Sequence, residues 1–289
     1  MNILKSLKLV ITTILLFICS TIAFGQKLAP KERILTPDHT IFSKIRGRDY
    51  QLHLSFPKNY STKDTITYPV LYSLDGMYTF PVIKGIRPFF ERDTEDFILV
   101  GVNASNFKYR NEDYTTSVAT FDEERNEKRN ATKSAFKTGG AAKFLESLKT
   151  EIIPFVDKNY KTNADRGIHG GSLGGLFAAY CLVNSDGYFT RFGISSPSFW
   201  WDNEKLLNQA VAQFTENKTW DLPQTKVYIS VGGQEGKTMV PTMMKFSKYL
   251  ENSNYDTINL KWQIFDGESH ISVQPANLRK TVYTLYGKK

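Results

Sequence analysis

Apolar residues recur along this chain in two patterns, and the two patterns alternate. Short, nearly continuous apolar runs are typical of strands covered on both faces of a sheet, and the stretches between them carry apolar residues at helical spacing. Strands that alternate with helices predict an α/β fold with a mostly parallel central sheet and helices on both faces. The expected strands are residues 68–74, 97–102, 192–195, 227–231 and 260–265, and the expected helices are 78–91, 141–160, 176–182, 243–250 and 278–286.

A different pattern precedes these elements. Within residues 49–56 apolar and polar positions alternate, as in a strand with one face toward water. Together with residues 41–45 this stretch predicts an antiparallel hairpin. His53 lies on the polar side of the alternation, so we expect it at the surface. We expect one domain over residues 41–289, preceded by a polar lead-in over residues 26–40.

The first residues have the features of a targeting segment. Residues 1–25 carry Lys5 and Lys8, then an uncharged apolar run, then small residues that suit a signal peptidase before Gln26. The apolar run is short for a membrane-spanning helix, so cleavage is favoured over an uncleaved anchor. We therefore predict a secreted or periplasmic protein without stable membrane insertion.

Composition narrows the class of protein further. The chain has 289 residues, 41% of them hydrophobic, and its 37 basic and 29 acidic residues give a formal charge of +8. This size suits one large α/β domain, and the interspersed charges indicate a solvated face rather than a nucleic-acid-binding module. Loss of Cys19 with the signal leaves Cys181, which we expect to be a small buried hydrophobe. The chain lacks cysteine and histidine at zinc-site spacing, and we expect no metal or cofactor.

The chemistry of the chain centres on a G-x-S-x-G stretch from Gly170 to Gly174. A strand-like run precedes Ser172 and a helix-like run follows it, which is the setting of the nucleophile elbow of an α/β-hydrolase. The sharp turn needs small flanking residues, and Gly170 and Gly174 meet that need. The motif alone is short and also occurs in turns that bind phosphate or only pack closely, so the other residues must decide.

A serine hydroxyl needs a base to become a nucleophile, and the chain has four histidines. His39 and His53 precede the core sheet. His169 lies in the strand before the serine, so we expect its side chain to pack against the sheet. His270 alone follows the last strand, and the hydrolase order of serine, acid and histidine assigns it the role of general base and then general acid.

The acid of a triad would follow the strand over residues 227–231. Glu235 lies there, between the serine and His270 in the sequence, and would orient and stabilise the imidazolium. Asp202, Asp266 and Glu268 compete for this role. A catalytic dyad without a strong acid also stays open, as does a solvated loop carboxylate at position 235.

A tetrahedral intermediate needs two backbone N–H donors. The residue after the nucleophile, Leu173, is expected to supply one. The loop after the strand over residues 68–74 is expected to supply the other, from Met77 first and Gly76 next.

Two further stretches suggest contacts with a substrate. Trp200 and Trp201 follow the strand over residues 192–195, and adjacent tryptophans there would form a flat apolar wall for an aromatic or sugar group. A core role for either one is an equal alternative. Residues 103–140 are the least regular part of the domain, and they could form a lid or a surface insertion.

Taken together, these stretches resemble the Putative esterase family, which holds siderophore (enterochelin) esterases, esterase D-like enzymes, feruloyl esterases and mycolyltransferases. The resemblance implies an α/β-hydrolase with a serine nucleophile, and Asp75 and Arg110 of the shared motifs join the substrate-binding candidates. One departure is glutamate rather than the commoner aspartate as the acid, as also in the mycolyltransferases. The matching stretches are residues 72–76, Arg110 with Asp113 and Tyr114, 139–141, 153–154, 170–175, 196–201, and Gly267 with His270.

The expected function is a serine carboxylic-ester hydrolase that forms an acyl-enzyme on Ser172. Its substrate would be a siderophore-type lactone or a feruloyl or acetyl ester on a polysaccharide. An acyltransferase with the same residues, or an inactive binding protein of the same fold, stays open as an alternative.

Overall fold

The computed structural model describes residues 35–288 except 64, 119–136 and 218. The predicted signal segment 1–25, most of the lead-in and the middle of the irregular stretch 103–140 lie outside the described residues. Among the residues described, no helix combines the length and the apolar character needed to cross a membrane.

An eight-stranded sheet runs through the described part of the chain in the order β1-β2-β4-β3-β5-β6-β7-β8. Strand β2 is antiparallel to both of its neighbours, and every pair from β4 to β8 is parallel. The prediction of a mostly parallel sheet is therefore confirmed. The strands are β1 (His39–Ser43), β2 (Arg48–Ser55), β3 (Tyr68–Leu74), β4 (Ile98–Ala104), β5 (Thr162–Gly171), β6 (Arg191–Ser195), β7 (Thr225–Gly232) and β8 (Ile258–Phe265).

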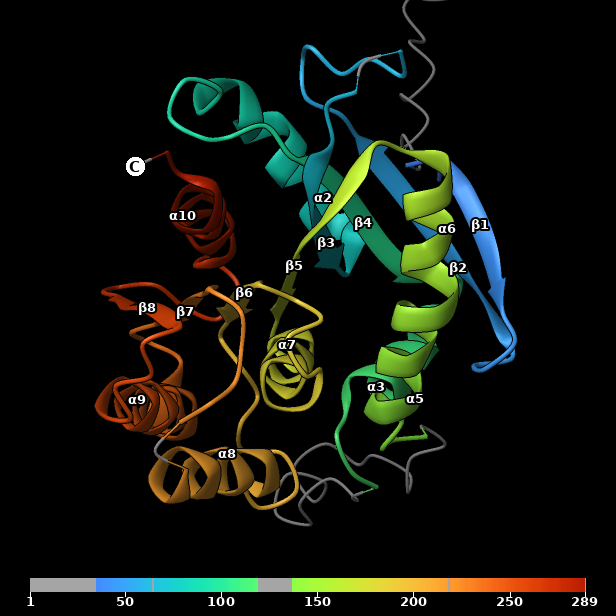
Figure 1. Cartoon of the computed structure of the whole chain (residues 1–289). Coiled ribbons are helices and arrows are strands. Elements are labelled where there is room, and N and C mark those ends of the chain that lie inside the picture. Colours follow the sequence, from blue (N-terminus) through green and yellow to red (C-terminus); the bar gives the residue numbers. More distant parts are fainter. Residues whose placement is uncertain (1–34, 64, 119–136, 218, 289) are drawn as a thin grey trace, which may run out of the picture. The chain divides into compact units, whose positions relative to one another are not determined.

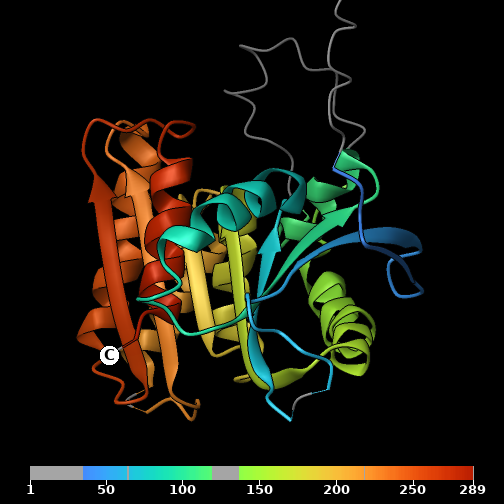
Figure 2. The same cartoon turned by 90° about the horizontal axis from the view of Figure 1, so that it is seen from above.

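Helices cover both faces of this sheet (Figures 1 and 2). On one face α10 packs against α2 and against β5, β6 and β7. The other face carries the remaining long helices, including the one that follows β5. The helices are α2 (Gly76–Ile86), α3 (Arg110–Tyr114), α5 (Ala141–Ser147), α6 (Ile153–Asn159), α7 (Leu173–Asn184), α8 (Lys205–Glu216), α9 (Gly236–Asn252) and α10 (Gln274–Tyr286), with short helical turns η1 (Arg87–Phe89), η2 (Phe107–Tyr109) and η3 (Leu148–Ile152).

The helix predicted over residues 141–160 has a local irregularity. A π-helical turn, η3, joins α5 to α6, and Pro154 lies in the first turn of α6. Proline lacks an N–H and its ring clashes with the carbonyl four residues earlier, so a wider turn before it accommodates the ring. Helix α8 was not among the expected elements, although it lies between β6 and β7 as a parallel crossover requires.

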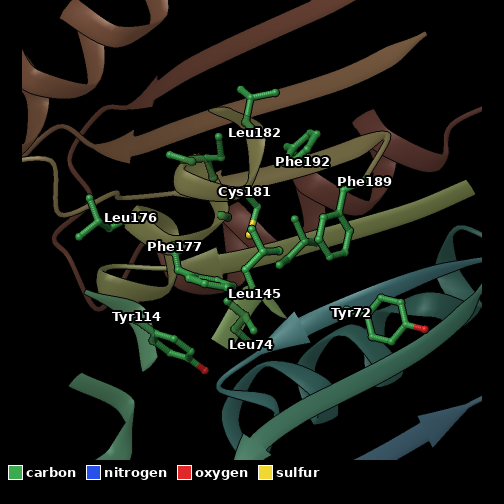
Figure 3. Close-up of a cluster of buried hydrophobic side chains, with 14 of the residues drawn as sticks. Tyr72, Leu74, Tyr114, Leu145, Leu176, Phe177, Cys181, Leu182, Phe189 and Phe192 are labelled. Carbon is green, nitrogen blue, oxygen red and sulfur yellow. The ribbon is translucent and has the colours of Figure 1, made fainter. Parts of the chain in front are cut away.

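The main hydrophobic core lies on the α7 face of the sheet (Figure 3). Phe177 of α7 packs against Phe144 of α5 and stacks on Tyr114 of α3, with ring centroids 4.9 Å and 5.9 Å apart. Cys181 lies in this cluster with 0% exposure, and burial raises the pKa of its thiol. The prediction of a small buried hydrophobe at position 181 is confirmed.

The opposite face of the sheet buries polar groups under α2 and α10. His53 is 2% exposed and lies 5.6 Å from the ring of Phe80 in α2, so its expected surface position was wrong. The polar side of β2 is covered by a helix that the local alternation does not indicate. His169, by contrast, packs against the sheet as predicted, with contacts from its ring nitrogens to Ser73 Oγ at 3.1 Å and Ser195 Oγ at 3.3 Å.

The burial of His169 predicts an acid-sensitive stability. Desolvation lowers the pKa of this imidazole to about 4, so the unfolded chain binds more protons between that pH and the ordinary histidine pKa. The contribution of the neutral imidazole to the free energy of unfolding is therefore complete above about pH 6.5. It falls with decreasing pH, by about 3 kcal/mol between pH 7 and pH 4. Urea unfolding of the wild type and of His169→Gln across this range should show a flatter dependence in the variant. Equal slopes for the two proteins would contradict the assignment.

Candidate active site

Strands β3 and β5 are adjacent in the sheet. The strand that follows β3 in the chain, β4, lies on one side of this pair, and the strand that follows β5, β6, lies on the other side. The loops at the carboxyl ends of two such strands border a crevice, which is where open α/β sheets bind ligands. Here β3 ends at Leu74, directly before Asp75 and Gly76, and β5 ends at Gly171, directly before Ser172. The sheet order thus brings the predicted oxyanion loop beside the predicted nucleophile.

Ser172 lies on a sharp turn between β5 and α7. Its φ of 60° and ψ of −120° are unusual for a residue with a side chain, and such strain is common at functional sites. The turn is held by its neighbours, because the Ser172 N–H donates to Ser195 O at 3.0 Å and the Ser198 N–H donates to Ser172 O at 3.1 Å.

Two glycines of this turn leave no room for a side chain. A Cβ on Gly170 would lie 2.2 Å from Gly174 O, and one on Gly175 would lie 2.6 Å from Ser195 O. At Gly174 itself the nearest atom would be 3.6 Å away, an ordinary contact. The glycines that this turn requires are therefore Gly170, which lies against the backbone of Gly174, and Gly175, which lies against Ser195 O. The steric requirement predicted for Gly174 is not seen at that position.

Glu235 and His270 are in direct contact. His270 Nδ1 lies 2.6 Å from Glu235 Oε2, and the glutamate side chain is fully buried whereas the histidine side chain is 37% exposed. Burial alone would raise the pKa of Glu235, but hydrogen bonds from His270, Ser196 and the Gly232 N–H outweigh it and lower the pKa. The carboxylate is thus ionised and positioned against the histidine.

The competing carboxylates have other partners. Asp202 forms an ion pair with Lys205 at 3.6 Å. Glu268 accepts a hydrogen bond from Ser272 Oγ. Asp266 is exposed. Glu235 is therefore the carboxylate that the structure brings to His270.

Ser172 and His270 line one cleft of about 320 Å³. Its walls are mostly apolar and come from the first turns of α2 and α10 and from the stretch after β4. The lining residues are Asp75, Tyr78, Thr79, Val82, Phe107, Arg110, Gly171, Ser172, His270, Ile271, Gln274, Pro275 and Leu278. A serine and a Glu-supported histidine thus face a common space large enough for a small-molecule substrate.

The predicted oxyanion donors lie at helix starts. Leu173 is the first residue of α7 and Gly76 the first of α2, where backbone N–H groups have no partner within the helix. The Met77 N–H instead donates to Asn103 Oδ1 at 3.0 Å. Since that hydrogen is already used, Gly76 is the better upstream candidate.

Arg110 and Asp75 form a paired charge at the edge of the cleft. The guanidinium donates to both carboxylate oxygens at 2.8 Å and to Gly171 O at 3.2 Å. Helix α3, which carries Arg110, is anchored from behind, because Asp113 accepts hydrogen bonds from Arg46 and Tyr50 at 2.7 Å. The arginine therefore braces the turn at Ser172 as well as facing the cleft.

The two tryptophans lie elsewhere. Trp201 is 2% exposed and its indole N–H donates to Ser117 O, and Trp200 packs against the main core. Neither belongs to the described lining of the cleft, so their positions do not fit the expected substrate wall. After β6 the chain turns toward α8 on the core side of the sheet. The aromatic wall is instead formed by Tyr78 and Phe107, whose ring centroids lie 6.4 Å apart. No motif in the sequence marks either residue as part of a site.

Comparison with known proteins agrees with this geometry. The family model described as Putative esterase matches residues 43–271. The ferri-bacillibactin esterase BesA of Bacillus subtilis is 25% identical over 247 residues, which are 81% of this chain and 83% of that protein. The apo-salmochelin esterase of Escherichia coli is 27% identical over 180 residues, 60% of this chain and 54% of that protein.

A solved structure extends the similarity to the fold. The BES protein from Bacillus cereus superposes with a TM-score of 0.74 at 29% identity, covering 90% of this chain and all of that chain. With the family match spanning most of the domain, and a serine and a histidine on one cleft, the chain belongs to the Putative esterase family and is a serine ester hydrolase of the α/β-hydrolase fold.

Proposed function

We propose that the protein hydrolyses ester bonds of a siderophore-type lactone through an acyl-enzyme on Ser172. The observation that carries the proposal is the 2.6 Å contact between Glu235 and His270, together with the shared cleft of His270 and Ser172. The siderophore substrate class is supported by the relatives, which include a ferri-bacillibactin esterase and an apo-salmochelin esterase.

The chemistry follows from the donors available. Because Nδ1 of His270 is bound to Glu235, Nε2 is the nitrogen that would take the proton of the Ser172 hydroxyl. The serine oxygen then attacks the ester carbonyl, and the N–H groups of Leu173 and Gly76 would stabilise the oxyanion. The histidine returns its proton to the leaving alcohol, and water activated in the same way releases the acid.

The cleft indicates what kind of group the substrate presents. Tyr78, Phe107 and Ile271, which line the cleft, are 61%, 64% and 77% exposed, whereas Leu278 in the same lining is 2% exposed. The positive charge of Arg110 is already matched by Asp75. We infer that the cleft takes an uncharged aromatic or hydrocarbon part of the ester.

A panel of esters tests this proposal. It comprises siderophore lactones with and without iron, feruloyl sugars, acetylated xylan and p-nitrophenyl acetate, each assayed with and without an alcohol acceptor. We expect hydrolysis of the lactones to linear products, and no diversion of the acyl group to the alcohol. Transfer to the alcohol would favour the acyltransferase alternative, and activity on the xylan alone would contradict the lactone proposal.

Variants at the cleft mouth test the apolar contact. Tyr78→Ala and Phe107→Ala should lower kcat/KM for aromatic esters about tenfold, the worth of one aromatic contact, and leave p-nitrophenyl acetate nearly unchanged. Phe42→Ala is the matched control, because Phe42 is an equally exposed aromatic residue on β1 (60%). An equal effect on both classes of ester would contradict the assigned contact.

A further inference from the structure

The segment that follows β6, Ser196 to Ser198, lies between the nucleophile turn and the acid. It was part of the family resemblance, yet the reaction described above uses none of its side chains. Ser198 is 1% exposed, and its Oγ lies 3.5 Å from Ser172 Oγ. On the opposite side, the Ser196 hydroxyl donates to Glu235 Oε1 at 2.5 Å. The segment therefore contacts both ends of the catalytic arrangement.

Three donors hold the carboxylate of Glu235. Oε1 accepts from the Ser196 hydroxyl and from the Gly232 N–H at 2.6 Å, and Oε2 faces His270. A carboxylate bound on one oxygen by two donors cannot rotate freely, so its second oxygen stays directed at the imidazole. Among these partners, Ser196 is the one that contributes a side chain besides the histidine.

The backbone of Ser196 is fixed in a conformation that serine rarely adopts. Its φ is 43° and its exposure is 0%. The Ser196 N–H donates to Ser230 O of β7 at 2.6 Å. Glycine would relieve this strain, so a serine here is explained by its hydroxyl rather than by its backbone.

We propose that Ser196 is a positioning residue that holds Glu235 in the orientation required by His270. The proposal rests on the proposed roles of Ser172, Glu235 and His270. In this arrangement the β6 segment couples the acid loop after β7 to the nucleophile turn after β5.

The test compares Ser196→Ala and Ser196→Gly with Ser195→Ala. Ser195 is the adjacent, equally buried serine, but its hydroxyl contacts His169 rather than Glu235. Both Ser196 variants should lower kcat on p-nitrophenyl acetate about tenfold, the equivalent of one hydrogen bond to a charged group, with KM unchanged. Ser196→Gly should do so without loss of thermal stability, because it removes the backbone strain.

The pH profile separates positioning from packing. The ionisable group facing Glu235 is His270, since the carboxylate of nearby Glu268 binds Ser272. Loss of the hydrogen bond from Ser196 raises the pKa of Glu235. The carboxylate oxygens, no longer shared with that donor, then interact more strongly with the imidazolium of His270, so the loss of activity on the acid side should move to higher pH. The downfield Nδ1–H resonance of His270 should shift in both Ser196 variants and stay in place in Ser195→Ala.

Two results would overturn the proposal. The first is a Ser196→Gly variant whose kcat, pH profile and His270 Nδ1–H resonance all equal those of the wild type. The other is an equal loss in Ser195→Ala, which would indicate a packing effect of the whole segment. Failure of the proposed roles of Ser172 and His270 is distinguishable from failure of this inference. In that case the wild type itself would neither hydrolyse p-nitrophenyl acetate nor be labelled at Ser172 by a fluorophosphonate, whereas the resonance would still report on the contact with Glu235.

Discussion

Ser172→Ala and His270→Ala should each lower kcat by roughly 10⁴- to 10⁶-fold, and the double variant should be no slower than either single variant. In the proposed mechanism the two side chains act as one unit, because the serine is a nucleophile only while the histidine takes its proton. They line the same cleft, and the backbone bonds that hold the Ser172 turn do not involve its hydroxyl. The folded state of Ser172→Ala should therefore persist.

Ester turnover and adduct mass after treatment with a fluorophosphonate are the measurements for this prediction. The wild type should gain one adduct on Ser172, and Ser172→Ala should gain none. Circular dichroism and thermal unfolding serve as controls for the fold. Labelling of Ser172→Ala at the wild-type rate, or independent losses that multiply in the double variant, would contradict the prediction.

Glu235→Gln should lower kcat about 10³- to 10⁴-fold with little change in KM, because an amide cannot stabilise the imidazolium and favours the wrong histidine tautomer. The glutamate side chain is fully buried, with Oε2 2.6 Å from His270 Nδ1, so water cannot easily take its place. The steady-state parameters on p-nitrophenyl acetate test this prediction.

Asp202→Asn is the matched control for that change. Asp202 was the main competing acid, its φ of 48° also suits asparagine, and its partner is Lys205. We expect nearly wild-type kcat for this variant. A large loss in Asp202→Asn together with an active Glu235→Gln would assign the acid to Asp202 instead.

Most of the order of strands and helices along this chain was readable from its residues, with α8 as an exception. Apolar runs indicate buried strands because a parallel sheet is covered on both faces, and the loops at their carboxyl ends meet at one edge. This reasoning singled out Ser172, Glu235 and His270, and the structure brings the last two into contact and places Ser172 and His270 on one cleft. Cys181 was likewise recognised as a buried residue of the α7 helix.

Where local pattern and tertiary packing differ, the packing decides. The alternation around His53 indicates a polar face, but whether that face meets water depends on α2, which comes from a distant part of the chain. The sequence suggests Trp200 and Trp201 as contacts for a substrate, but the direction of the chain after β6 places Trp201 in the core. Periodicity carries no information about which way a loop turns.

The residues alone thus predict the fold class, the family, and the candidate nucleophile with its candidate partners, because each depends on local spacing or on order along the chain. Tertiary structure decides what surrounds them: the Ser196 hydroxyl on Glu235, the pairing of Arg110 with Asp75, and the apolar wall of Tyr78 and Phe107. These contacts join separate segments of the chain across the sheet edge, and their geometry follows from side-chain packing rather than from any periodic pattern in the sequence.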